Sequence, residues 1–317
     1  MSTDTTGIHH VTAIGGAPQQ NVDFYVGMLG LRMVKKTVNF DDPETYHLYY
    51  GDGDGTPGSI MTFFPWAHAP AGLQGTGQLT ITSFSIPESS LGYWTDRLID
   101  HGIRFEKPSQ RFDDTVVSFA DPEGMKLELI ASATDDRGPW ENGTVPSEHA
   151  IRGFHHVTLS ERDPGRTTKL MTEHLGFRQV EEGDGRHRFE AGNGGPGNLV
   201  DVVDGSKESR GRMGVGTVHH VAFRAENDEH QLEIREKVAG LGYDVTPVLD
   251  RNYFHSIYFR EPGGVLFEIA TDPPGFAVDE DPAELGTSLK LPPQYESRRE
   301  HLESVLPTLR VPTETGE

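Results

Sequence analysis

The sequence of 317 residues contains no cysteine. This absence excludes a disulfide framework, a thiolate metal site and a cysteine nucleophile, so any metal ion must bind His, Asp or Glu side chains. No run of about 18 apolar residues is present, which argues against a transmembrane helix. The N-terminus shows no positively charged segment followed by an apolar stretch, and we therefore expect a cytoplasmic protein.

Basic residues are scarce compared with acidic ones. Lys and Arg together number 28 against 49 Asp and Glu, which gives a net charge of −21. Without a basic stripe to neutralise phosphates, the composition argues against nucleic-acid binding and against docking on an anionic membrane. The acidity fits a salt-adapted protein or an ordinary soluble enzyme, because net charge bears on solubility and not on fold.

The sequence does contain an internal repeat. Adjacent histidines recur in strand-like segments at 7–12, 153–158 and 217–222, and segment 78–82 has the same strand character without histidine. Each segment is followed by a helical pattern that ends at a glycine, and then by short strands with Asp, Gly and Pro turns. The fourth helical pattern includes Leu232, Val238 and Leu241. We number these strand–helix–multistrand units one to four.

Spacings show which units correspond. His10 to Gly30 and His156 to Gly176 both span 20 residues, so unit one matches unit three. The last strands of units two and four contain a carboxylate 48 residues after the first strand, in the pairs Thr80 and Glu128, and His220 and Glu268. The chain is therefore a duplicated pair of units.

This order of elements resembles the vicinal oxygen chelate superfamily, which includes glyoxalases, bleomycin-resistance proteins and extradiol dioxygenases. The resemblance covers roughly residues 7–271. It implies an α+β fold in which four βαβββ modules, in two tandem domains, pair into cup-shaped mixed sheets with helices outside. We expect a first pair of modules at 1–135, a linker at 136–151, a second pair at 152–271, and an acidic, proline-containing tail at 272–317 with a short helix near 294–306.

Three pairings of the units would each form a different candidate metal site. Units one and four would combine His10, His220 and Glu268, a set that suits non-haem Fe(II) and leaves positions for substrate and dioxygen. Units three and four would combine the four ligands His156, Asp201, His220 and Glu268, which better suit a glyoxalase-like Zn or Ni isomerase. Units two and three would combine Glu128, His156 and Asp201, with Thr80 where a histidine is needed.

A closer resemblance favours the first pairing. Segments 34–38, 46–50, 55–58, 148–155 and 250–254 are similar to those of hydroquinone-type ring-cleaving dioxygenases. That resemblance implies Fe(II) at His10, His220 and Glu268, with Mn, Zn or Ni as alternatives, and a small aromatic substrate together with O₂. Unit three keeps both of its histidines, so His156 and Asp201 remain alternative ligands.

The resemblance also suggests catalytic residues around this site. Tyr258 lies ten residues before Glu268 across a Pro-Gly-Gly turn, so the two can occupy adjacent strands, and the resemblance places such a tyrosine near the metal. Arg251 matches an arginine that can stabilise a phenolate. Thr12 shares strand parity with His10 and can line the pocket.

His9 and His219 point away from the pocket by simple strand alternation. The resemblance nevertheless implies that they support the neighbouring ligands, and a bulged strand would reconcile the two expectations.

We therefore predict a non-haem Fe(II)-dependent, extradiol-type dioxygenase that opens the ring of a hydroquinone or catechol with O₂. Two alternatives stay open: a metal-dependent isomerase or lyase of the glyoxalase type, and a non-catalytic protein that binds aromatic compounds. The sequence does not determine the oligomeric state, and a homo-oligomer is among the states that it allows.

Overall fold

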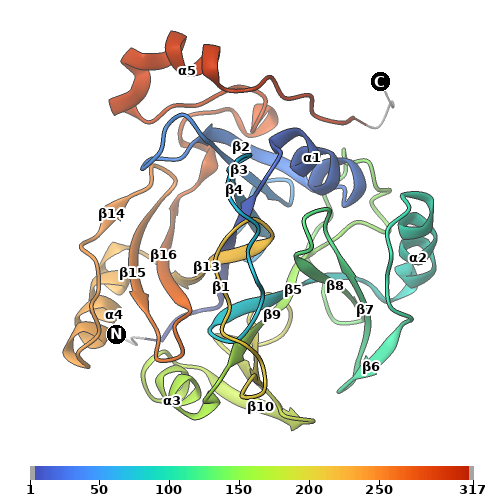
Figure 1. Ribbon diagram of the computed structural model, residues 1–317, viewed down its shortest axis with the longest axis vertical. Coiled ribbons are helices and arrows are strands. Elements are labelled where there is room, and N and C mark those ends of the chain that lie inside the picture. The colour runs from blue at the N-terminus through green and yellow to red at the C-terminus, as the bar shows by residue number, and fades with distance from the viewer. Residues whose placement is uncertain (1–3, 314–317) are drawn as a thin grey trace.

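The computed structural model describes residues 4–313 and contains two eight-stranded mixed sheets (Figure 1). The first sheet, in the order β14-β15-β16-β13-β1-β4-β3-β2, consists of β1 Ile8–Gly15, β2 Arg32–Val38, β3 Tyr46–Gly51, β4 Ile60–Pro65, β13 Thr217–Ala225, β14 Leu249–Asp250, β15 Phe254–Arg260 and β16 Leu266–Pro274. The second sheet, in the order β10-β11-β12-β9-β5-β8-β7-β6, consists of β5 Gln78–Pro87, β6 Ser109–Arg111, β7 Asp114–Ala120, β8 Lys126–Ser132, β9 Gly153–Glu161, β10 Arg178–Gly183, β11 Arg186–Glu190 and β12 Leu199–Asp204.

Each sheet joins one unit from each half of the chain. β1 of unit one pairs antiparallel with β13 of unit four, and β5 of unit two pairs antiparallel with β9 of unit three. We call the curved faces of these sheets the first cup and the second cup. The expected α+β fold of paired βαβββ modules is confirmed, whereas the boundaries of the two halves stay a prediction. The alternative in which units three and four form one cup is wrong.

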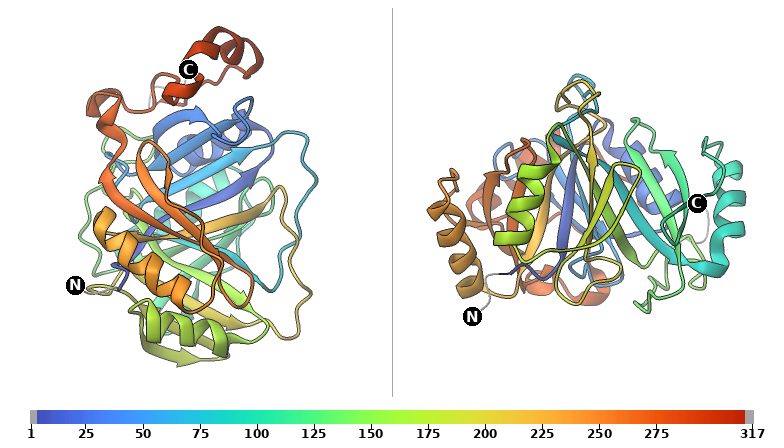
Figure 2. Two further views of the ribbon diagram at one scale, coloured as in Figure 1. Left: turned by 90° about the vertical axis from the view of Figure 1, so that its left-hand side faces the viewer. Right: turned by 90° about the horizontal axis from the view of Figure 1, so that it is seen from below.

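The helices lie outside the sheets, as expected (Figures 1 and 2). They are α1 Pro18–Val22, continued by a π-helical segment Asp23–Met28, and α2 Leu91–Asp100, α3 Pro164–His174, α4 Asp228–Gly240 and α5 Arg299–Val305. The shorter 3₁₀ segments are Glu88–Ser90, Phe276–Val278, Pro282–Glu284 and Pro293–Arg298. An amphipathic helix can bury its apolar stripe only against the sheet, and so Trp94 and Leu98 of α2 are buried.

Helix α4 does not use the apolar face that its sequence indicates. Leu232 and Leu241 are exposed, whereas Ile234 and Val238 are buried together with the polar Gln231. The amide of Gln231 donates hydrogen bonds to the carbonyl oxygens of His255 and Ile269, at 2.7 and 2.8 Å. These bonds to β15 and β16 satisfy a buried amide and fix the rotation of the helix, so that Val238 is the one residue of the three-residue apolar pattern that is buried.

The tail packs across the first sheet, where it forms the top of the molecule in Figure 1. The fully buried amino group of Lys35 lies 2.6 Å from a carboxylate oxygen of Asp279 and also binds Glu280. Phe276 inserts beside the rings of Tyr49 and Tyr253, with ring centroids 5.2 and 5.1 Å apart. A buried ammonium needs such partners, so this ion pair fixes the tail on the sheet.

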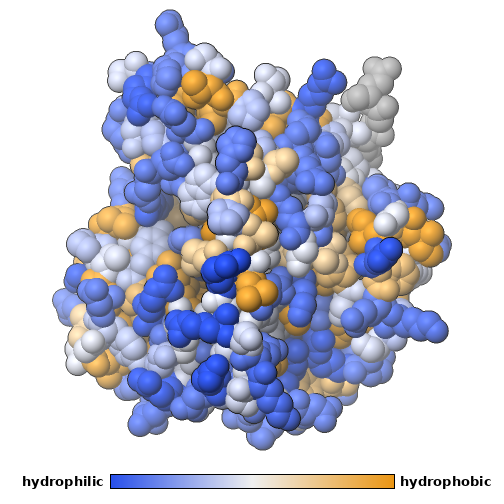
Figure 3. Space-filling view, viewed as in Figure 1, coloured by the Kyte–Doolittle hydropathy of each residue, from blue (hydrophilic) through white to orange (hydrophobic). Residues whose placement is uncertain are grey.

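The face seen in Figure 3 is mostly hydrophilic, with hydrophobic residues scattered over it. None of the helices within residues 4–313 combines the length and the apolar character that a membrane span requires.

Candidate active site

A cavity of about 560 Å³ opens in the first cup. Its walls are largely aromatic and apolar, and they include Phe40, Phe64, Trp66, Leu249, Phe254 and Leu266. Six of the residues predicted for the site line it as well, namely His10, Thr12, His219, His220, Arg251 and Tyr258, so the expectation from simple alternation that His219 points away from the pocket is wrong. An apolar pocket that contains a few convergent polar groups is typical of small-molecule binding sites.

Three predicted ligands converge at this cavity. His10, His220 and Glu268 each place a ligand atom within 4.8 Å of the other two, and they form the one such group found among residues 4–313. Oε2 of Glu268 lies 3.3 Å from Nε2 of His10 and 2.8 Å from Nε2 of His220. The strands bring these side chains together, since β1 and β13 are neighbours and β13 lies between β1 and β16.

The carboxylate of Glu268 is buried and only half satisfied. Oε1 accepts a hydrogen bond from the hydroxyl of Ser256, whereas Oε2 accepts none from the described residues. Burial by itself raises the pKa of a carboxyl, but the neighbouring imidazoles of His10 and His220 hold the pKa of Glu268 well below its ordinary value. A buried anionic oxygen without a hydrogen-bond partner, facing two imidazole nitrogens, fits a divalent cation.

His9 fixes the tautomer of His10. Nε2 of His9 lies 3.2 Å from the carbonyl oxygen of Thr271, an acceptor, so Nε2 of His9 carries the ring proton. Burial, the first cause, and the neighbouring His10 lower the pKa of His9 well below its usual value, which keeps the ring neutral. Nδ1 of His9 is then an acceptor for Nδ1–H of His10, 2.9 Å away, and Nε2 of His10 is left bare.

The second pair has a similar geometry. Nδ1 of His219 lies 2.7 Å from Nδ1 of His220, and Nε2 of His220 points to Glu268. Both strands are bulged at the first histidine of the pair. The pairing of β1 with β13 skips His9 on β1 and His219 on β13. Both histidines of each pair can therefore stand close together, as the resemblance implied and as simple alternation does not allow.

Tyr258 and Arg251 line the same cavity. Tyr258 is paired with Glu268 across β15 and β16, as its distance from the turn predicts. Its ring lies edge-on to that of His220, with centroids 5.6 Å apart, and the guanidinium of Arg251 lies 5.6 Å from its centroid. Burial and Glu268 raise the pKa of Tyr258 above its usual value while Arg251 opposes this, so the phenol keeps its proton at neutral pH.

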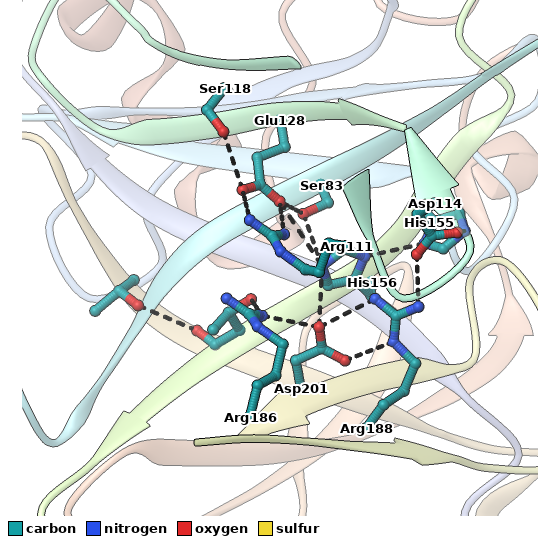
Figure 4. A network of polar contacts seen from close by, with 12 residues as sticks. Ser83, Arg111, Asp114, Ser118, Glu128, His155, His156, Arg186, Arg188 and Asp201 are labelled. Atoms are coloured by element: carbon teal, nitrogen blue, oxygen red, sulfur yellow. Dashed lines mark hydrogen bonds and ion pairs between the residues drawn. The ribbon is translucent and has the colours of Figure 1, made fainter. Parts of the chain in front are cut away.

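The second cup holds a different set of residues (Figure 4). Glu128 is bound by both terminal nitrogens of Arg111, at 2.7 and 2.8 Å. Asp201 is bound by Arg186 and Arg188, and Nε2 of His156 lies 3.4 Å from it. The site predicted for units two and three is thus occupied by arginines, and the alternative ligands His156 and Asp201 are not brought to His220 and Glu268.

Ile81, and not Thr80, takes the place of His220 in the second cup. Ile81 is paired with Thr158 as His220 is paired with Thr12. β5 bulges at Thr80 as β13 bulges at His219, so Thr80 corresponds to His219. From Ile81 to Glu128 is 47 residues whereas from His220 to Glu268 is 48, and counting 48 residues back from Glu128 therefore misplaces the position by one.

Two polar residues of the first cup, Ser256 and His47, lie outside the set predicted from the sequence. Ser256, which binds Glu268, lies two residues before Tyr258, and strand parity could have indicated it. His47 lines the cavity, and it lies within one of the segments on which the closer resemblance rests. A lone histidine in a strand gives no sign of which face it occupies.

Comparisons with known proteins show the family to which this chain belongs. The Glyoxalase/Bleomycin resistance protein/Dioxygenase superfamily matches residues 7–129 and 153–269. MhqO of Bacillus subtilis, which is named a ring-cleaving dioxygenase, is 48% identical over 307 residues, which cover 96% of this chain and 97% of that protein. The chlorohydroquinone/hydroquinone 1,2-dioxygenase of Sphingobium indicum is 37% identical over 303 residues, with 93% and 94% covered.

Solved structures show the same fold. A crystal structure of a Bacillus subtilis protein described as a dioxygenase is 46% identical and has a TM-score of 0.94, with 98% of this chain and 100% of that chain covered. Glyoxalase I from Zea mays, 15% identical with a TM-score of 0.62, covers 84% of this chain and 92% of its own and shares the fold alone. The chain belongs to the Glyoxalase/Bleomycin resistance protein/Dioxygenase superfamily.

Proposed function

We propose that this protein is a ring-cleaving dioxygenase that holds Fe(II) at His10, His220 and Glu268 and opens a hydroquinone or catechol ring with O₂. The observation that carries the proposal is the convergence of these three side chains at an aromatic-walled cavity. Two imidazoles and one carboxylate are the ligands typical of non-haem Fe(II) oxygenases. The relatives named as ring-cleaving and hydroquinone dioxygenases support the same reaction.

Bound iron would supply coordination positions at which a phenolic oxygen and dioxygen can meet. The chain's own groups would bind and orient the ring. Arg251 provides a fixed positive charge beside the cavity, suited to an anionic phenolate oxygen. Tyr258, protonated at neutral pH, can donate a proton or a hydrogen bond to an oxygen held near Glu268. We place this activity in the cytoplasm.

A specific observation makes an isomerase of the glyoxalase type less suitable. Its four-ligand set would need His156 and Asp201 beside His220, but these two residues belong to the second cup. A protein that only binds aromatic compounds would need the cavity but no metal ion. In such a protein nothing would bind the buried Oε2 of Glu268, which has no hydrogen-bond partner among residues 4–313.

Oxygen uptake tests the proposal. The purified protein is loaded anaerobically with Fe(II), and O₂ consumption is followed with a panel of hydroquinones and catechols. Stoichiometric consumption of O₂ and ring, with both oxygen atoms in the product, is expected. If every substrate fails while a hemithioacetal is converted by the Zn- or Ni-loaded protein, the chain is an isomerase. If aromatic compounds bind but none reacts, it is a binding protein.

A further inference from the structure

Four neutral side chains form a hydrogen-bonded chain in the wall of the first cup. The hydroxyl of Tyr49 lies 2.9 Å from Nδ1 of His47, and Nε2 of His47 lies 2.8 Å from the hydroxyl oxygen of Thr62. The hydroxyl of Thr62 donates to that of Thr12 across β4 and β1, at 3.0 Å. His47, Tyr49 and Thr12 line the cavity, and Thr62 is fully buried behind them.

The direction of this chain follows from its last bond. A threonine hydroxyl has one proton, and Thr62 gives it to Thr12, so Thr62 can only accept from His47. Nε2 of His47 therefore carries the ring proton, and Nδ1 accepts the proton of Tyr49. Burial, together with the neighbouring His10 and His220, lowers the pKa of His47 well below its usual value, which agrees with a neutral ring.

One proton at the end of the chain is left without an acceptor. Thr12 receives a hydrogen bond from Thr62, and none of the described residues accepts the proton of its own hydroxyl. Thr12 lies two residues after His10 on β1 and is the pairing partner of His220 on β13. This donor is thus held at the floor of the cavity, beside two of the proposed ligands.

The second cup shows that these positions need not carry neutral groups. The strand pairings place Arg188 opposite Asp201 and Asp201 beside Thr158, as Tyr49 is opposite Thr62 and Thr62 beside Thr12. The residues that correspond to Tyr49, His47, Thr62 and Thr12 are therefore Arg188, Arg186, Asp201 and Thr158. There Arg186 donates to Asp201 at 2.8 Å (Figure 4) and to Thr158 at 3.0 Å, so a charged guanidinium takes the place that the neutral His47 has in the first cup.

We propose that Tyr49, His47 and Thr62 are positioning residues that direct the hydroxyl of Thr12 toward an anionic oxygen of the bound aromatic substrate. The inference rests on the proposed function and adds a recognition element to the same site. A phenolate oxygen beside the metal ligands is an acceptor, and a hydrogen bond to a charged acceptor is stronger than one between neutral groups. With the proton of Thr62 engaged, the hydroxyl of Thr12 can use its own proton only toward the cavity.

The test compares variants of Thr62, the link that does not itself line the cavity. Thr62→Val keeps the shape and removes the donor, whereas Thr62→Ser keeps the donor. Binding of 4-nitrocatechol to the Fe(II)-loaded protein is titrated without oxygen at one fixed pH, and iron content is measured in parallel. Thr62→Val is expected to lower the affinity for 4-nitrocatechol about threefold to tenfold at full iron content, which is the effect of one hydrogen bond. Thr62→Ser is expected to retain most of the affinity.

Two further variants make the result specific. Thr82→Val changes a fully buried strand threonine of the second sheet whose hydroxyl has no partner, and it should leave probe binding unchanged. Tyr49→Phe removes the hydroxyl at the far end of the hydrogen-bonded chain. Combined with Thr62→Val, it should add little to the loss of probe affinity in Thr62→Val alone, because the effects of residues that act through one another are not additive.

Two results would overturn the proposal: wild-type probe affinity in Thr62→Val, or loss of iron in that variant, which would mean that the chain supports the metal ligands instead. If the wild-type protein binds the probe but consumes no O₂ with any substrate, the proposed reaction fails. The binding comparison still decides the role of the chain in that case.

Discussion

Arg111 occupies the place in the second cup that Arg251 occupies in the first, but the two guanidinium groups bind different partners. Arg111 is paired with Asp114 at the end of the β6–β7 hairpin, and the backbone amide of Arg251 bonds to Phe254 in the same way. Arg111 binds the cup's own carboxylate, Glu128, through two nitrogens. No ion pair joins Arg251 to Glu268 in residues 4–313, and the carboxylate of the first cup stays available to its histidines.

Removal of Arg111 is therefore expected to destabilise the fold without removing the metal site. Arg111→Ala leaves Glu128 buried without its cation, which typically costs about 3–5 kcal/mol. Urea unfolding measures the loss, and Arg111→Ala combined with Glu128→Gln should recover part of it. An unchanged unfolding midpoint in Arg111→Ala would show that Ser83 and Ser118, which also donate to Glu128, suffice.

The same carboxylate predicts sensitivity to acid. Burial opposes ionisation of Glu128, but Arg111 and His156 lower its pKa from 4.5 to about 2. A carboxyl whose pKa is lower in the folded protein stabilises the fold above the unfolded pKa, and this contribution is lost as pH falls from about 4.5 toward 2. Unfolding free energies measured across this range should fall less steeply in Glu128→Gln than in the wild type; parallel curves would contradict the assignment.

Metal analysis of two histidine variants separates the cups. His10→Ala removes a proposed ligand and should abolish Fe(II) binding, whereas His156→Ala removes the corresponding histidine of the second cup and should leave the iron content unchanged. Circular dichroism confirms folding in both. Retention of iron in His10→Ala together with its loss in His156→Ala would place the metal in the second cup.

The paired modules and the residues of the first cup could be predicted because periodic patterns and short motifs in the sequence indicate them. His10, Tyr258 and Glu268 occupy strand positions whose parity and distance from a turn can be counted. The bulges at His9 and His219 were anticipated only through the resemblance, since an extra residue in one strand does not alter the sequence pattern.

Other features depend on contacts between distant segments. Ile81 is recognised as the counterpart of His220 only from the pairing of β5 with β9, because unit two has one residue fewer between this position and its carboxylate. Arg186 and Arg188 fill the second cup because β11 pairs with β12 in a particular register, which the sequence of this polar hairpin does not reveal. The rotation of α4 depends on carbonyl groups of β15 and β16 that lie outside the helix.

Tyr258→Phe should lower turnover far more than metal content. A general acid–base group typically contributes about 10²–10⁴-fold to rate, and the variant removes a hydroxyl without changing the ring that packs against His220. The measurement is kcat for O₂ uptake at full iron occupancy. Unchanged turnover would remove Tyr258 from the reaction and leave Arg251 as the neighbouring group to test.

Variants of His9 test whether the adjacent histidine prepares the ligand. His9 accepts a hydrogen bond from Nδ1–H of His10, and this bond directs the bare Nε2 of His10 toward Glu268. His9→Leu should weaken Fe(II) affinity about 10–100-fold, the usual effect of losing a partner of a metal-bound histidine, whereas His9→Asn restores an acceptor oxygen close to the position of Nδ1 and should recover part of it.

His155 provides the matched control, because its Nδ1 lies 2.9 Å from that of His156 in the second cup. His155→Leu repeats the same change in the same strand environment and should leave Fe(II) affinity unchanged. Competition with a chelator measures the affinities. Equal losses in His9→Leu and His155→Leu would show that the substitution acts through general destabilisation, and no loss in either would show that His10 holds its orientation without His9.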